Sequence, residues 1–236
     1  MELFDSYIKN IENLLDGMTP KRFPFDKANV WPTSARGELI LVRDSAYELG
    51  GGDKNSVGLS VVTENLNVEN ETLLFGPDIS EIKADCDFAK IVLLKIKDFS
   101  ADEQQLFNVV KELEYVKYKV NVKGFMARAS AMNHREQIRI GKEAVKNGLS
   151  FEKIGNTLIE SYLKYPNVAA AKIIFVTDSR LNFDELTAQA EKISALTKAL
   201  NHILDNVLVD CKNCNLKPIC DEVEGMRELH MGMAKK

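Results

Sequence analysis

The chain has 236 residues, 45% of them hydrophobic and 28% charged, and a formal net charge of −4. These values are typical of a globular protein with one large domain or two small ones, and the negative charge argues against general nucleic-acid binding. The first residues lack the basic and apolar regions of a signal peptide, and no apolar run reaches the length of a membrane span. We therefore expect a cytoplasmic protein that binds neither membrane nor nucleic acid.

The first half of the chain predicts a helix, an extended arm, a series of strands and a second helix. Apolar residues at helical spacing predict the first helix over 3–16, and three prolines predict the extended arm over 17–36. The second helix is expected over 101–118. Runs rich in β-branched residues predict strands over 38–42, 57–63, 71–75 and 89–96.

The second half predicts strands and helices in irregular alternation. Ser150 is placed to cap a helix that begins at the next residue. The order of elements predicts a mixed α/β fold of the α+β class, with a mixed sheet, flanking helices and a C-terminal helical segment that contains cysteines. The expected elements are a strand over 120–125, helices over 133–147 and 151–164, a buried strand over 171–177, a long helix over 183–206 and a short last helix.

Three of the four cysteines lie within ten residues near the C-terminus, at Cys211, Cys214 and Cys220. In a reducing compartment, clustered cysteines are more often metal ligands or redox thiols than disulfides. The C-x2-C-x5-C spacing lets the thiolates converge on an iron–sulfur cluster or zinc, with Cys86, or for zinc His230, as the fourth ligand. Half-buried thiols packed into a turn, and reactive thiols without metal, are the alternative interpretations.

A second candidate site is a basic stripe on the predicted 133–147 helix. Four basic side chains at i, i+4, i+7 and i+11 share one helix face, and Arg128 lies just upstream. Guanidinium groups pair with phosphate oxygens, as in a nucleotide or coenzyme A. A charged stripe is also typical of a solvated helix face, so both interpretations stay open. The four stripe residues are Arg135, Arg139, Lys142 and Lys146.

The run Gly50-Gly51-Gly52 offers backbone amides that can cradle an anion. It belongs to no nucleotide-binding motif, so a hairpin turn is the favoured interpretation. The three histidines are scattered through the sequence, and no arrangement of histidine, serine or paired carboxylates indicates a catalytic centre.

Several motifs, in the same order, resemble one enzyme family. The first are Asp44-Ser-Ala-Tyr-Glu-Leu-Gly50 and the Gly76-Pro77-Asp78 turn with Glu81. The next are Lys123-Gly-Phe-Met-Ala-Arg-Ala-Ser130 and Arg135-Glu-x-x-Arg139, followed by Phe175-Val-Thr177 and the cysteine segment. Together they resemble the middle region of acetyl-CoA synthase, the α subunit of the bacterial carbon monoxide dehydrogenase/acetyl-CoA synthase and the β subunit of the archaeal complex. The resemblance covers about residues 37–224.

The resemblance implies a role for the basic residues. In the family, an arginine-rich surface of the middle region is proposed to receive coenzyme A and to face partner proteins. The resemblance therefore implies that Arg128, Arg135, Arg139 and Lys142 bind the phosphates of coenzyme A or a similar ligand. One departure is Gln137, which stands where the family has a tryptophan, so stacking of an adenine on that residue is lost.

The resemblance also implies a division of the chain and an absent cofactor. We expect residues 1–36 to form an N-terminal helix and arm, and residues 37–236 to form the middle-domain-like region, with a sub-boundary near residue 120. The family's nickel A-cluster is held in the following domain by other cysteines, including a Cys-Gly-Cys pair. This sequence contains no such pair, so we expect no nickel A-cluster.

We therefore expect a stand-alone homologue of the middle domain, an accessory or binding protein of CO and one-carbon metabolism that does not catalyse acetyl-CoA synthesis alone. Its expected partners are a phosphate-bearing small molecule and proteins of the CO dehydrogenase/acetyl-CoA synthase type. One alternative is an iron–sulfur or zinc protein for electron transfer or metal delivery. Another is one chain of a split CO-methylating acetyl-CoA synthase, an acyltransferase.

Overall fold

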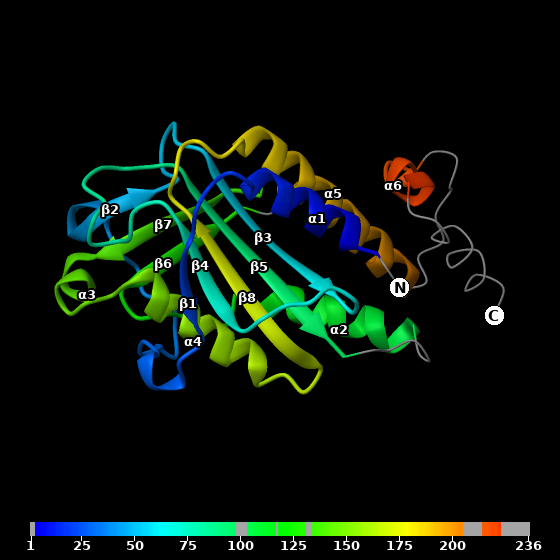
Figure 1. Ribbon diagram of the computed structural model, residues 1–236, viewed down its shortest axis with the longest axis horizontal. Helices are drawn as coiled ribbons and strands as arrows, with labels where there is room; N and C mark the ends of the chain where they lie inside the picture. Colours follow the sequence, from blue (N-terminus) through cyan, green and yellow to red (C-terminus); the bar gives the residue numbers. More distant parts are fainter. Residues whose placement is uncertain (1–2, 98–102, 117, 131–133, 205–213, 223–236) are drawn as a thin grey trace.

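The computed structural model describes residues 3–97, 103–116, 118–130, 134–204 and 214–222, which form a mixed α/β fold with two β-sheets (Figure 1). The predicted fold class is confirmed. The larger sheet has the strand order β1 (Lys21–Pro24), β4 (Glu71–Phe75), β8 (Val168–Val176), β5 (Phe88–Ile96) and β3 (Ser56–Thr63). The smaller sheet has the order β2 (Ser45–Leu49), β7 (Glu136–Gly141) and β6 (Phe125–Ala129).

The central strand of the larger sheet is β8, which is parallel to β4 and antiparallel to β5. The two outer pairs also differ in strand direction, since β3 is parallel to β5 and β1 is antiparallel to β4. Most residues of β5 and β8 are buried, as expected of strands covered on both faces. Such strands read as nearly continuous apolar runs, which is why the sequence predicts them well.

Helices and the smaller sheet cover the two faces of the larger sheet. Helix α1 (Asp5–Leu15) is joined to β3 by a hydrogen bond from Thr63 Oγ1 to Asp5 Oδ1 (2.7 Å), and α5 (Phe183–Leu204) lies beside α1 and packs on β3. On the other face, Phe151 of α4 (Phe151–Leu163) contacts Phe175 of β8, with ring centroids 4.6 Å apart. The smaller sheet covers the remainder of that face, where β7 contacts β3 and β5.

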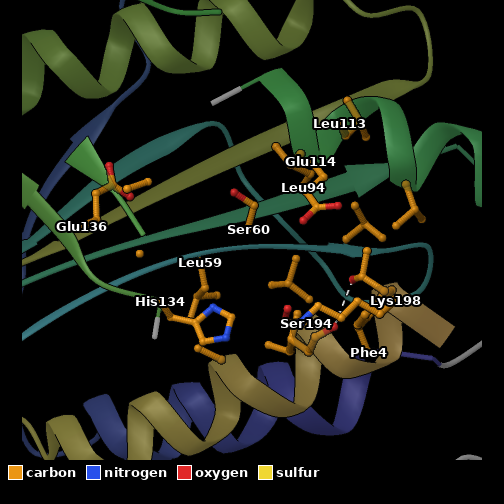
Figure 2. Close-up of a pocket in the computed structure, with 18 of the residues that line it drawn as sticks. Phe4, Leu59, Ser60, Leu94, Leu113, Glu114, His134, Glu136, Ser194 and Lys198 are labelled. Atoms are coloured by element: carbon orange, nitrogen blue, oxygen red, sulfur yellow. Dashed lines mark hydrogen bonds between the residues drawn. The ribbon is translucent and has the colours of Figure 1, made fainter. Parts of the chain in front are cut away.

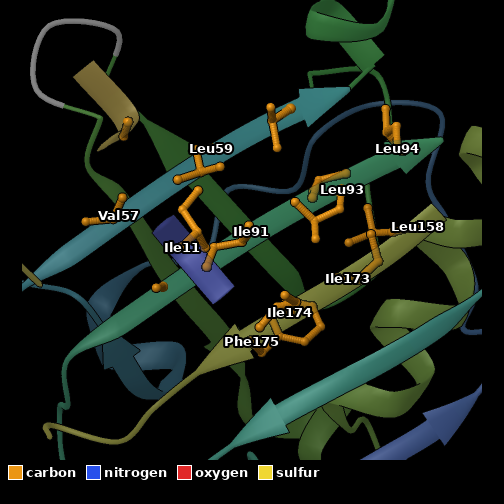
Figure 3. Packing of buried hydrophobic residues seen from close by; sticks show 14 of the residues in the cluster. Ile11, Val57, Leu59, Ile91, Leu93, Leu94, Leu158, Ile173, Ile174 and Phe175 are labelled. Carbon is orange, nitrogen blue, oxygen red and sulfur yellow. The ribbon is translucent and has the colours of Figure 1, made fainter. Parts of the chain in front are cut away.

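The core is a single cluster of buried apolar side chains from both faces. Figure 3 shows Ile11 of α1 together with Val57 and Leu59 of β3 and Ile91 of β5. Helix α2 (Glu103–Val116) packs against α5. The short helices are η1 (Lys27–Asn29), η2 (Val42–Asp44), α3 (Lys142–Lys146) and α6 (Lys217–Glu222).

Most predicted elements are confirmed, with ends that differ by a few residues. The strands over 57–63, 71–75 and 89–96 correspond to β3, β4 and β5, and the 171–177 strand corresponds to β8. The predicted helices over 3–16, 101–118, 151–164 and 183–206 correspond to α1, α2, α4 and α5. Ser150 caps α4 as predicted, because its side chain accepts the N–H of Lys153 at 3.3 Å.

Three of the predicted helices and strands are wrong. Residues 38–42 are not a strand, because no neighbouring strand pairs with them, and the short helix η2 begins at Val42. The 120–125 strand begins only at Phe125. The 133–147 helix is instead strand β7 followed by α3, because Glu136, Ile138 and Ile140 are buried at the two-residue period of a strand.

The sequence also failed to predict β2, whose residues are mostly half-buried. The division at residues 36 and 120 stays a prediction. Among the described residues, no helix combines the length and the apolar character needed to cross a membrane.

Candidate functional site

The predicted arginines lie together on one face of the smaller sheet, although not on a helix. Strand β7 directs Gln137 and Arg139 away from the core side that buries Ile138, and Arg135 immediately precedes the strand. The register of β6 and β7 sets Arg128 directly opposite Gln137. We call this surface, made of Glu48, Arg128, Arg135, Gln137 and Arg139, the arginine face.

Arg139 is fixed by Glu48 of β2 and by the backbone of Ile40, which precedes η2. Its Nε donates to Glu48 Oε1 in an ion pair in which both side chains are 16% exposed, and its Nη1 lies 3.3 Å from the carbonyl oxygen of Ile40. Gln137 Nε2 donates to the other carboxylate oxygen of Glu48 at 3.1 Å. Glu48 therefore orients two side chains of the arginine face.

Arg135 closes the glycine loop. Its Nη2 donates to the carbonyl oxygens of Gly50, Gly52 and Lys54 at 3.0–3.2 Å. The loop joins β2 of the smaller sheet to β3 of the larger one, so it is not the predicted hairpin turn. The carbonyl groups of the loop surround the guanidinium cation of Arg135. This contact connects the two sheets.

The other two predicted basic residues differ in their surroundings. Arg128 is exposed on β6, and among the described residues it has no hydrogen-bond or ion-pair partner. Lys142 is exposed at the first position of α3, directly after the end of β7. The three arginines are thus on or beside two paired strands, and Lys142 is on the helix that follows them.

Lys142 lines an open cleft of about 720 Å³, which we call the Lys142 cleft. Trp31 forms part of its wall, and the indole Nε1 donates to the carbonyl oxygen of Lys123 at 2.8 Å. Leu39 lies on the wall with 80% of its surface exposed, and Val42, three residues later, is 61% exposed. The cleft also contains three carboxylates and a second lysine: Glu38, Asp44, Glu143 and Lys123.

The Gly76-Pro77-Asp78 motif connects the ends of β4 and β8 to the start of α4, and we call it the Asp78 joint. The backbone N–H of Asp78 donates to Glu81 Oε2 at 2.7 Å, and Asp78 Oδ1 accepts the first N–H of α4, from Phe151, at 3.0 Å. Thr177 donates its hydroxyl to the carbonyl oxygen of Pro77 at 2.8 Å. Two of the family-like motifs therefore bind each other and fix the start of α4.

The structure describes only part of the cysteine segment. Cys214 lies just before α6 and Cys220 lies within it, and both are half-buried, whereas Cys211 and His230 lie outside the described residues. The backbone of Cys86 forms an isolated β-bridge with Leu49, the last residue of β2. Strand β2 is far from α6 (Figure 1). Burial raises the pKa of the Cys86 thiol from its ordinary value to about 11. Within the described ranges, no three histidine, cysteine or carboxylate side chains are grouped as a metal site would require.

One buried polar pair is absent from the sequence-based predictions. Lys90 on β5 and Glu136 on β7 form an ion pair between the two sheets, with side chains 8% and 4% exposed. The signal in the sequence is a lysine in the middle of an otherwise apolar run, Phe88–Ile96. Its partner lies 46 residues away, so spacing could not identify the pair.

Comparisons with known proteins show the family to which the chain belongs. A comparison with curated proteins found no match. The family model of the CO dehydrogenase/acetyl-CoA synthase complex beta subunit matches residues 30–181. This range is more than half of the chain and includes the arginine face, the Lys142 cleft and the Asp78 joint. The chain therefore belongs to the family of the CO dehydrogenase/acetyl-CoA synthase complex beta subunit.

Proposed function

We propose that this chain is a binding module of CO and one-carbon metabolism that receives the phosphates of coenzyme A, or of a similar ligand, on the arginine face. The observation that supports this best is the strand register, which places exposed Arg128 beside Gln137 and between Arg135 and Arg139. Three guanidinium groups and one carboxylate give this face a net positive charge. Guanidinium forks pair with phosphate oxygens two bonds at a time.

The internal contacts of two arginines support binding. Glu48 and the glycine-loop carbonyls hold Arg139 and Arg135 in fixed positions, so little side-chain freedom remains to be lost when an anion arrives. A guanidinium carries five N–H donors, and Arg139 uses two of them in the contacts described above. Arg128 has the most exposed guanidinium environment of the three and supplies the first contact with a phosphate. Lys142 lies nearer the cleft and reaches a more distant part of the ligand.

Calorimetry with coenzyme A tests this function. We expect saturable binding that weakens as salt is added and that Arg128→Ala weakens by about tenfold, the loss of one charged hydrogen-bonding group. Arg180→Ala removes an exposed arginine whose partner is Asp178, outside this face, and is the matched control. Absence of heat with the wild-type protein, or equal binding by both variants, contradicts the proposal.

A second candidate function is docking to a protein of the CO dehydrogenase/acetyl-CoA synthase type. The exposed apolar side chains of Leu39, Leu41 and Val42 beside the Lys142 cleft favour it, because contiguous exposed apolar surface is typical of interaction sites. In the split-enzyme interpretation, the partner is the chain that carries the nickel A-cluster.

Size-exclusion chromatography of this protein mixed with the purified A-cluster chain tests the docking function. A complex is expected with the wild-type protein and should be lost in Leu39→Asp. Tyr115→Asp introduces the same charge at an exposed aromatic residue of α2, away from the cleft, and should leave the complex intact. Loss of the complex in both variants, or in neither, contradicts docking through the cleft.

A metal-binding role rests on the cysteine segment. Under this proposal, Cys211, Cys214 and Cys220 hold zinc or an iron–sulfur cluster for electron transfer or metal delivery. Thiolates suit both groups. The half-buried positions of Cys214 and Cys220 are compatible with such ligands.

A further inference from the structure

Lys90 and Glu136 lie on the side of the smaller sheet opposite the arginine face, in the layer between the two sheets. Figure 2 shows Glu136 projecting into this layer on the same side of β3 as Ser60. Removing two charges from water costs several kcal/mol per ion, and this cost is offset only where further hydrogen bonds satisfy the pair. The burial of both side chains therefore raises the question of what else they bind.

The pair has hydrogen-bonding capacity that the described residues do not use. An ammonium group carries three N–H donors, and among the described residues Lys90 donates to Glu136 Oε1 alone. The second carboxylate oxygen of Glu136 lies over Gly58, which has no Cβ to cover it. Buried donors and acceptors of this kind are normally paired. The ion pair thus presents spare donors beside a spare acceptor.

Lys90 and Glu136 line a cavity between the two sheets. This cavity of about 150 Å³ is lined by Lys90, Glu136 and apolar side chains that include Val122, Phe125 and Leu158. Its wall also contains the polar side chains of Glu38, Tyr118 and Asn121. A second cavity of about 130 Å³ lies along β3 and shares Glu136 with the first. One water takes ~30 Å³ in the liquid, so the first cavity has room for a molecule of several heavy atoms. Mostly apolar walls with a few convergent polar groups are typical of small-molecule sites.

We infer that Lys90 and Glu136 form a binding site for a small neutral carboxamide. The carbonyl oxygen of the amide accepts an N–H of Lys90, and the amide N–H donates to the free oxygen of Glu136. The short carbon chain of the ligand lies against Val122, Phe125 and Leu158. The site lies on the side of the smaller sheet opposite the arginine face and shares Glu38 with the wall of the Lys142 cleft, and it involves binding without a chemical step.

Charge selects this class of ligand. The Lys90–Glu136 pair is neutral overall, and Glu38 adds a further carboxylate to the cavity wall. A carboxylate ligand would therefore place another negative charge against Glu136 and Glu38, and an alkylammonium in the position of the amide would place a second positive charge against Lys90. A neutral amide offers one acceptor and one donor on adjacent atoms without adding a buried charge. Tyr162 lies nearby as a neutral group, because burial, and then the Glu136 carboxylate, raises its pKa well above the ordinary range.

The experiment uses three probes of the same length with different head groups: propanamide, propanoate and propylammonium. In protein-observed NMR titrations of the intact chain, propanamide should give saturable shifts in the amide signals of Gly58, Ala127 and Glu136. An affinity in the millimolar range is reasonable for about five non-hydrogen atoms. Propanoate and propylammonium should bind at least about tenfold more weakly, because each leaves one charge unfavourably placed.

A blocking variant tests the location without disturbing the ion pair. Ala127 is exposed on β6 and lines the cavity, so Ala127→Leu should fill the hollow and abolish the propanamide shifts. Ala169→Leu adds the same side chain at an exposed position of β8 that lines none of the cavities described here, and it should bind propanamide as the wild type does.

Three results would overturn the inference: no saturable shift with propanamide, equal binding of a charged probe, or shifts that survive Ala127→Leu in a folded protein. The comparison of the three probes on the wild-type protein stands even if Ala127→Leu does not fold. Binding of coenzyme A at the arginine face is measured by a different ligand and different variants, so either proposal can fail alone.

Discussion

Gly58 of β3 lies directly beneath Glu136 of β7, and their contact leaves no space for a Cβ at position 58. A Cβ built there would be 2.7 Å from the Cβ of Glu136 and closer still to its carboxylate. The backbone N–H of Gly58 also donates to the carbonyl oxygen of His134 at 2.8 Å, so β7 is held against the edge of β3. The absence of a side chain at Gly58 allows the two sheets to meet.

Gly58→Ala should therefore destabilise the protein. We expect a loss of about 1–3 kcal/mol in the free energy of unfolding, the usual cost of inserting a methyl group into a close contact. Urea denaturation monitored by circular dichroism measures it. Gly141→Ala is the matched control on β7, because its Cβ would be 3.7 Å from the nearest atom and its φ of −68° suits alanine. Equal stability of both variants would show that Glu136 moves aside without cost.

Arg139 and Glu48 should be energetically coupled. Both side chains are mostly buried, so a double-mutant cycle with Arg139→Ala and Glu48→Ala should give a coupling of about 0.5–3 kcal/mol in urea denaturation. The pair Lys21–Glu81, which is about half exposed, should show a smaller coupling because water screens it. No coupling between Arg139 and Glu48 would mean that Arg139 is not held in position before a ligand binds.

Cys86 should be nearly unreactive in the folded protein. With its pKa raised to about 11, the thiol is almost entirely protonated at pH 8, and only the thiolate reacts with iodoacetamide. Labelling measured by mass spectrometry should be about 100-fold slower than in urea, where the pKa returns to about 8.5. Because the folded pKa is the higher one, the associated stability is present below about pH 8.5 and is lost as the pH rises through about 11. Rapid labelling at pH 8 would refute the burial of this thiol.

The metal-binding proposal predicts stoichiometric zinc or iron in protein purified without oxygen. Elemental analysis should find about one zinc ion or one iron–sulfur cluster per chain, and Cys214→Ser should remove most of it. Cys86→Ser is the control and should retain the metal, because Cys86 lies by β2, far from α6. Folded wild-type protein without metal would exclude this role for the cysteines.

An element was predicted correctly where a short stretch of sequence contains the pattern that determines its structure. Strands β5 and β8 are nearly continuous apolar runs, so their burial is visible in the sequence itself. The sequence predicts a helix over 133–147, where the basic residues share one helical face, whereas the burial of β7 alternates every two residues. What decides between these patterns is contact with β2 and β6, which no local window contains.

The sequence brings three of the candidate binding residues together, whereas their binding role stays a prediction. Arg128, Arg135 and Arg139 were grouped from a family-like motif, and the strand register groups them again on a different element. The partner of Arg139 is 91 residues away in the sequence, and the partners of Arg135 are backbone carbonyls more than 80 residues away. Such contacts belong to the tertiary structure, so neither the fixed arginines nor the Lys90–Glu136 pair could be read from spacing.

The position of β8 has a consequence for how the chain folds during synthesis. Strand β8 lies between β4 and β5 but follows them in the chain by more than 70 residues. Until it leaves the ribosome, two apolar strands have no partner on their inner edges, and such edges are templates for aggregation. The inner edges of β4 and β5 are therefore paired only after β8 has been synthesised.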